Sequence, residues 1–332
     1  MIDVGHGNCA VVTGAEWAMM IDAGASAAVI QTVAHLGITR LDSIVISHRD
    51  FDHARGLVQL LGRESLEIGA IYIGADAAKN PSAPETANLL VALADAKANG
   101  RCVVSRDLDD TFTTERLSGG GVAVEVLAPT FATAMTGPKG TSPVGLPMTS
   151  NSVSAVLRVT LADGLQILLP GDMDEVALEE LTTAGADLSA DVLVFPHHGS
   201  LGTVPDERGF AAAVMRAVGA HTVLFSVGRA QKARPTHEVL SGVFDINPEA
   251  RIACTQLSSG CLAADTGLPN ESAALTHLTA IPGEGQSRCR SCAGSMSLSG
   301  VGMTGPDSEA HEAFLVATAS TPMCRDLRPP LS

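Results

Sequence analysis

The sequence predicts an α/β fold in which two β-rich halves are each flanked by helices. Short apolar runs bounded by turn residues alternate with segments of helical spacing over residues 1–255 of the 332-residue chain. Four of the apolar runs end next to Asp or His, at Asp22, His48, Asp172 and His197. Loops that follow strand ends at one edge of a sheet lie close together, so this repeated pattern predicts a polar site at that edge.

Each element is expected from its local pattern. Residues 8–12 and 17–21 form a hairpin pattern, and Ser26 is a suitable cap for a helix that stops at Gly37. The apolar run 41–47 predicts a buried strand, and residues 85–98 have helical spacing. Further strands are expected at 70–73, 122–127, 152–161, 165–169, 192–195 and 222–227, and further helices at 174–184, 210–218 and 237–244. The Gly-, Pro-, Thr- and Ser-rich stretch 129–150 predicts a flexible loop near the site.

The densest group of metal-ligand residue types follows the predicted strand 41–47. Two imidazoles and two carboxylates occupy the six positions from His48 to His53. A pair of metal ions needs ligands on both sides and a bridging carboxylate, which one loop cannot supply. We therefore expect partners from Asp172 and from the pair His197 and His198, although Asp172 is also a candidate helix N-cap. Ordinary loop histidines are the competing interpretation of the run itself.

The order of these motifs resembles that of the metallo-β-lactamase-fold hydrolases. The carrying residues are Asp22, His48-x-Asp50-x-Asp52-His53, Gly171-Asp172 and His197-His198-Gly199-Ser200. The opening Ile2-Asp3-Val4-Gly5-His6-Gly7-Asn8 is similar to the first strand and turn of ComEC-type DNA-uptake proteins and their stand-alone bacterial relatives. The resemblance implies a four-layer αββα sandwich over residues 1–255, followed by a Cys-, Gly- and Ser-rich extension over residues 256–332.

The resemblance also implies a ligand set. His48 and Asp50 would serve one metal, Asp52 and His53 the other, and Asp172 would bridge them. A later His completes the second site; we expect His197 to be this ligand and His198 to protonate the leaving group, and the reverse assignment stays open. Most of the superfamily has His at the Asp50 position, and a carboxylate there favours Mn²⁺ over Zn²⁺, with Mg²⁺ also compatible.

Several further positions have two interpretations. Asn151 stands where the superfamily has another His and is a weak additional ligand. ComEC relatives carry a His before a late Pro, where this chain has Arg234; either Arg234 binds phosphate there or His237 is the ligand. Asp22 and His6 are interpreted as turn residues.

A metal-dependent hydrolase with a metal-activated water is the expected function, and a phosphodiesterase of the nuclease type is favoured. Asp52, Asp172 and His198 are the expected catalytic residues. Ser200 and the basic group Arg229, Lys232 and Arg234 would contact the substrate, unless the basic group is only a solvated loop.

The formal net charge of −15 excludes a broad nonspecific DNA-binding surface and favours a small or single-stranded nucleic acid or nucleotide substrate. Two other functions remain: hydrolysis of an amide or ester bond, which Asp50 and Asn151 disfavour, and a non-catalytic module that binds a protein partner through the C-terminal extension.

Cysteines gather late in the chain, where five of the seven lie from Cys254 onward. Four ligands drawn from Cys254, Cys261, His277, Cys289 and Cys292 could form a structural Zn²⁺ site; buried thiols and disulfides are the alternatives. The sequence has no apolar run of about 18 residues and no secretory signal, so we expect a cytoplasmic protein without a membrane span. The oligomeric state does not follow from the sequence.

Overall fold

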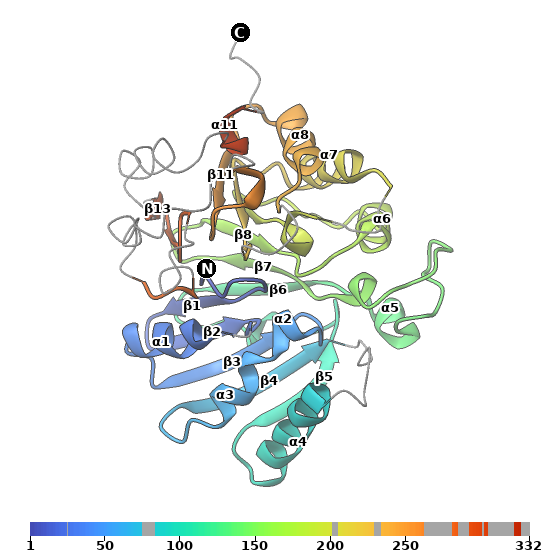
Figure 1. Ribbon diagram of the computed structural model, residues 1–332. Coiled ribbons are helices and arrows are strands. Elements are labelled where there is room, and N and C mark those ends of the chain that lie inside the picture. Colours follow the sequence, from blue (N-terminus) through green and yellow to red (C-terminus); the bar gives the residue numbers. More distant parts are fainter. Residues whose placement is uncertain are drawn as a thin grey trace.

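The computed structural model describes residues 1–24, 26–74, 84–200, 205–228, 234–261, 281–284, 292–300, 302–304 and 322–326 (Figure 1). Two sheets pack face to face at its centre, and helices cover their outer faces. The apolar layer between the sheets takes side chains from both, such as Met19 and Val45 from the first sheet and Leu157 and Leu224 from the second. The predicted four-layer αββα sandwich is therefore confirmed.

The first sheet has the strand order β1-β2-β3-β4-β5. Strands β1 and β2 form the predicted antiparallel hairpin, and β2 to β5 run parallel. Helices α1, α3 and α4 cover its outer face through buried Ala, Val and Leu side chains (Figure 1). The bounds are β1 Ala10–Gly14, β2 Trp17–Ile21, β3 Arg40–Ile46, β4 Glu67–Gly74, β5 Val103–Leu108, α1 Ala27–His35, α3 Gly56–Leu61 and α4 Pro84–Ala98.

The second sheet has the strand order β11-β10-β9-β8-β7-β6. Strands β6, β7 and β8 form an antiparallel meander, and β8 to β11 run parallel. Helices α6, α7 and α8 cover its outer face, where Phe195 stacks on Phe225. The bounds are β6 Ala123–Ala128, β7 Val156–Thr160, β8 Gln166–Leu169, β9 Val192–Val194, β10 Thr222–Phe225, β11 Arg251–Cys254, α6 Glu175–Thr183, α7 Glu207–Val218 and α8 His237–Ile246.

The parallel strands give the sandwich two unlike edges. The carboxyl ends of the strands carry the predicted ligand loops, and a hydrogen bond from Ala155 N to Ser47 O at 2.9 Å joins the two sheets there. At the opposite edge, helices turn back into strands; Gly100 follows α4 and Gly219 caps α7, and a side chain added at either glycine would meet no atom within 4 Å.

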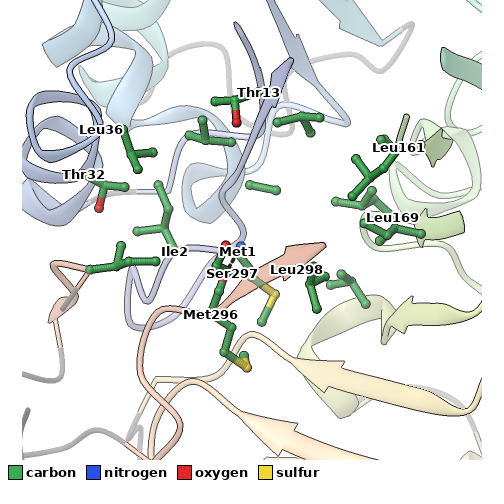
Figure 2. A pocket seen from close by; sticks show the side chains of 17 residues that line it. Met1, Ile2, Thr13, Thr32, Leu36, Leu161, Leu169, Met296, Ser297 and Leu298 are labelled. Carbon is green, nitrogen blue, oxygen red and sulfur yellow. Dashed lines mark hydrogen bonds between the residues drawn. The ribbon is translucent and has the colours of Figure 1, made fainter. Parts of the chain in front are cut away.

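The described parts of the C-terminal extension pack against the sandwich. The Met1 ammonium group donates to Met296 O at 2.7 Å, and Asp3 N donates to Ser295 Oγ at 2.9 Å. Met1, Met296 and Leu298 are among the residues that line a pocket between β1 and residues 296–298 (Figure 2). Short strands β12 (Ser297–Ser299) and β13 (Gly302–Thr304) pair with each other. The boundary at residue 255 stays a prediction.

Some elements differ from the expectation. Strand β5 was missed because it is a sheet-edge strand in which Ser105, Arg106 and Asp107 interrupt the apolar pattern, and β11 was missed because it is an edge strand that begins with an exposed Arg and buries only Ala253 fully. Two short helices, α2 (Phe51–Ala54) and α3, follow β3, and α5 (Phe131–Thr136) lies within the predicted loop 129–150. The N-cap of α6 is Asp174, whose side chain accepts from Ala177 N, which leaves the Asp172 carboxylate available for another role.

Candidate metal centre

Three of the predicted motifs reach the site, one from the first sheet and two from the second. Strand β3 ends at Ile46, and the next residues turn into α2, which groups His48, Asp52 and His53 on one loop. Asp172 lies two residues after the Pro that follows β8, and His198 lies in the 3₁₀ turn Pro196–Gly199 after β9. The carboxyl ends of three parallel strands thus place these side chains at one edge of the sandwich.

Three buried side chains, which we call the inner set, are His48, His53 and Asp172. His53 Nε2 lies 3.1 Å from Asp172 Oδ1, and His48 Nε2 lies 3.7 Å from Asp172 Oδ2. Among the described residues, His48 Nε2, His53 Nε2 and Asp172 Oδ1 are buried without a hydrogen-bond partner. Unpaired buried polar atoms are costly, so their gathering at one point fits a bound cation that would use all three.

A second group, the outer set, consists of His6, Asp52 and His198. Asp52 Oδ2 lies 3.2 Å from His6 Nε2 and 3.3 Å from His198 Nε2. His6 was expected to be a turn residue, and its place here was missed. The signal available in the sequence was its position between Gly5 and Gly7 in a turn that can approach other backbone closely.

The two sets are adjacent. His198 Nε2 of the outer set lies 3.8 Å from Asp172 Oδ1 of the inner set. Each set offers three donor atoms of the types that bind Zn²⁺ and Mn²⁺, and each set has its donor atoms within 4.8 Å of one another. The donor chemistry therefore fits two divalent ions side by side.

Partners outside the two sets fix the orientation of the histidines. Asp22 Oδ2 lies 2.7 Å from His53 Nδ1, and the same carboxylate accepts from Ser47 N at 2.7 Å. His198 Nδ1 lies 3.0 Å from the carbonyl oxygen of Ser226, to which it donates. A histidine that donates through Nδ1 presents Nε2 as the free lone pair, so these contacts prepare Nε2 of both rings for a metal.

Left-handed backbone conformations gather around the same point. Asp22, His197 and His198 have φ of 57°, 53° and 58°. Such values are uncommon for residues with a side chain and are held only where the surroundings determine them. Gly7 is required for a different reason, because a Cβ there would lie 2.2 Å from Asp52 O.

A comparison with families of known proteins identifies the family to which the chain belongs. A family model described as the metallo-beta-lactamase superfamily matches residues 2–204. The chain belongs to this superfamily. The resemblance expected from the motifs is thereby confirmed, and members of this superfamily bind divalent metals.

Individual relatives of this metallo-β-lactamase chain are distant. Competence protein ComA of Neisseria gonorrhoeae is 29% identical over 203 residues, a match that covers 60% of this chain and 23% of ComA. The chain therefore spans about a quarter of the length of that relative.

Solved structures share the fold at low identity. Unliganded yeast PDE1 matches with a TM-score of 0.50 and 11% identity, over 76% of this chain and 95% of that one. Igni18, a metallo hydrolase from Ignicoccus hospitalis, matches with a TM-score of 0.43 and 15% identity over 76% and 93%. Every helix within the described ranges is too short or too polar to span a bilayer.

In the metal centre of this metallo-β-lactamase chain, neighbouring charged groups strongly shift one another's pKa values. Burial opposes charging of His53, but the carboxylates of Asp172 and Asp22 outweigh it and raise the pKa of His53 well above its usual value. Burial also opposes ionisation of Asp172, but His53 and His198 hold the pKa of Asp172 well below its usual range. A metal bound at His53 Nε2 would compete with a proton for that atom.

The outer set contains a neutral histidine. Burial and the nearby ring of His198 lower the pKa of His6 to about 4, against the opposing charge of Asp52. His6 is therefore uncharged at neutral pH, which is the state in which imidazole binds a metal. Burial also lowers the pKa of His197, with Asp172 opposing.

The other predicted ligands belong to neither of the two sets. Asp50 Oδ2 is 3.6 Å from His48 Nε2. His197 Nδ1 lies 3.8 Å from Asp172 Oδ2 and 3.1 Å from Asn151 Nδ2, so the amide of Asn151 faces His197. His237 is exposed at the first position of α8 and belongs to neither set.

The predicted substrate contacts are only partly within the described residues. The Ser200 hydroxyl is buried and donates to Glu207 Oε1 at 3.4 Å. The positive charge of Arg234 acts on the pKa of both His6 and His197, which places it beside the centre. Arg229 and Lys232 lie outside the described residues, as do His277 and Cys289 of the predicted zinc group.

Proposed function

We propose that the chain is a metal-dependent phosphodiesterase that acts on a nucleic acid or nucleotide through two adjacent divalent ions. The observation that carries the proposal is the pair of three-residue donor sets, which meet across the 3.8 Å between His198 Nε2 and Asp172 Oδ1. Two adjacent ions suit in-line displacement at phosphorus, because the attacking and the leaving oxygen each need a positive charge.

The geometry groups the ligands differently from the family-based expectation. His53 lies with His48 and Asp172, whereas Asp52 lies with His198 and His6. We therefore propose the inner set for one ion and the outer set for the other. Asp172 Oδ1 lies 3.1 Å from His53 Nε2 of the inner set and 3.8 Å from His198 Nε2 of the outer set, so Asp172 is the proposed bridge.

The two adjacent histidines take separate roles in this proposal. His198 is almost fully buried and directs Nε2 at Asp52, so we assign it as the ligand. The side chain of His197 is 24% exposed and lies beside Asn151, so we assign it as the group that donates a proton to the leaving oxygen. Both assignments reverse those expected from the sequence.

A bound divalent ion would lower the pKa of a water and neutralise charge on the phosphate. The protein contributes the placement of the substrate. Arg234 lies beside His6 and His197 and is suited to bind a phosphate oxygen through its planar guanidinium group. The carboxylates of Asp50, Asp52 and Asp172 keep Mn²⁺ ahead of Zn²⁺ in the proposal.

The test combines metal content with hydrolysis. The protein is stripped with a chelator and reloaded with Mn²⁺, Zn²⁺ or Mg²⁺. It is then assayed on bis(p-nitrophenyl) phosphate, labelled single-stranded DNA, duplex DNA, RNA and cyclic nucleotides. We expect about two ions per chain and phosphodiester cleavage. Asp52→Ala should lower kcat/KM by at least about 100-fold. Asp95→Ala, an exposed carboxylate on α4, is the matched control and should behave as the parent.

One outcome would overturn the proposal. If the ions bind and no phosphodiester is cleaved, the chain is not a free-standing phosphodiesterase. A parallel assay with p-nitrophenyl acetate and nitrocefin then shows whether the centre hydrolyses esters or amides instead.

A further inference from the structure

Four cysteines gather at a place separate from the metal centre, although within the described residues no three of their sulfur atoms lie within 4.8 Å of one another. Cys254 ends β11, Cys261 lies in the 3₁₀ turn Ser259–Cys261, Cys292 follows in the extension, and Cys324 lies in the short helix α11 (Met323–Asp326). All four line one small pocket on the outer side of the second sheet. Up to 70 positions of sequence separate their segments, so chain proximity does not explain the gathering.

The backbone holds the first three of these residues in place. Cys292 N donates to Thr255 O at 3.0 Å, and Ala293 N donates to Cys254 O at 2.8 Å. Cys261 N donates to Ser258 O at 3.0 Å. The fourth, Cys324, is brought by α11, which packs against α8. Thiols fixed by backbone contacts are better prepared for a ligand than thiols on mobile loops.

The surroundings suit a soft cation. Apolar side chains, including Leu240, Leu257 and Met323, make up much of the remaining pocket wall. Four thiolates could not share such a place without a positive charge. Zn²⁺ resolves this by binding four thiolates in a tetrahedral arrangement with bonds of about 2.3 Å.

The alternative is that the four thiols simply fill apolar space. Two other cysteines in the chain show how thiols in that role are placed. Cys9 and Cys102 are buried singly in the apolar layer outside the first sheet. They pack there as small apolar groups and have no cysteine cluster around them among the described residues. The gathering near β11 therefore differs in kind from the isolated thiols.

We propose that Cys254, Cys261, Cys292 and Cys324 bind one structural Zn²⁺ ion that fastens the C-terminal extension to the second sheet. The site is independent of the proposed phosphodiesterase activity. It differs from the group expected from sequence, because Cys324 from the last described helix replaces ligands that lie outside the described residues.

The zinc pocket also lies behind the catalytic turn. Pro235 is part of its wall, and the Pro235 ring lies close enough that a Cβ on Gly199 would be 2.7 Å from it. Thr236 N donates to Gly199 O at 2.9 Å. A zinc ion here would therefore stiffen the support of the turn that contains His198.

The test uses the full chain with the metal centre disabled by His48→Ala and Asp172→Ala. After expression with zinc and treatment with EDTA, zinc is counted by mass spectrometry. We expect one retained equivalent, lost in Cys254→Ser and in Cys324→Ser. Cys9→Ser and Cys102→Ser are the matched controls and should retain it. Substitution of zinc by Co²⁺ should give the near-ultraviolet charge-transfer band of thiolate ligands.

Two results would overturn the proposal: no retained zinc in the disabled background, or equal zinc in Cys254→Ser and the parent. If the serine variants do not fold, an organomercurial titration of the disabled protein decides instead. Release of the zinc as thiols are modified supports the site, and thiol modification without zinc release refutes it. Disulfides detected by mass spectrometry before reduction would also refute it.

Discussion

Asp22→Asn tests how the protein prepares His53 for a metal. Asp22 is buried, and its carboxylate receives Ser47 N at 2.7 Å, Ser47 Oγ at 2.9 Å and His53 Nδ1 at 2.7 Å. An amide has the same shape, so little packing changes. It offers one acceptor oxygen in place of two, however, and an NH₂ group facing His53 would compete with the proton on Nδ1. The ring would then shift its proton to Nε2, the atom that the metal needs.

The magnitude follows from the role of the carboxylate. Loss of a group that orients a metal-binding histidine typically costs 10- to 100-fold in metal affinity. That range corresponds to about 1.4–2.7 kcal/mol. We expect Asp22→Asn to fall in this range for the ion at the inner set. The ion at the outer set should change less, because the His198 contact to Ser226 O is untouched.

Competition with a metal-sensitive dye measures both affinities. The matched control is Asp42→Asn on the neighbouring strand β3, where the carboxylate accepts from Ala18 N at 3.1 Å, away from the centre. An equal loss in both variants would show a general effect on the sheet. An affinity in Asp22→Asn within about threefold of the parent would refute the role assigned to Asp22.

Three further predictions concern stability in urea. Gly171 has a φ of 55°, and a Cβ there would lie 2.4 Å from a serine oxygen, so Gly171→Ala should lower the free energy of unfolding by about 2–4 kcal/mol. Gly185 has a φ of 71° but lies in open space, so Gly185→Ala should lower it by only about 1–2 kcal/mol. Equal losses in the two variants would refute the crowding at Gly171. Arg158→Ala removes contacts of 2.7 and 3.0 Å to two partly exposed carboxylates and should lower the free energy of unfolding by about 1–2 kcal/mol. The loss should be smaller at high salt, because salt screens the ion pairs. A loss that does not change with salt would contradict this prediction. Phe195→Ala should cost about 3–5 kcal/mol, and exposed Phe131→Ala less than about 0.5 kcal/mol; similar values would argue against the packing described.

Much of the fold was readable from the sequence because long apolar strands and capped helices carry strong local signals. Strand β3 and helix α1 with its Ser26 cap were both expected. The short or polar elements were not. Edge strand β5 has no clear apolar pattern because only Leu108 of its six residues is buried, and α11 is only four residues long.

The candidate site was only partly readable. The His48 to His53 run stood out because its ligands are adjacent in sequence. His6 did not, because its partners Asp52 and His198 are brought to it by tertiary structure alone. The choice between His197 and His198 depends on backbone direction within a left-handed turn, which residue spacing does not report. Cys324 was missed for the same reason as His6.

Two glycines, Gly100 and Gly219, mark an edge of the molecule, opposite the metal centre, where a label could be placed. Gly100 and Gly219 have free space around them and lie at the ends of helices that run back from the ligand-bearing edge. Because φ of 65° and 69° disfavours a side chain at either glycine, a fluorophore or an affinity peptide is better joined to the turns around them, where it would leave the ligand-bearing loops clear. The protein could then be immobilised or tracked with the edge that carries the metal centre facing the solution.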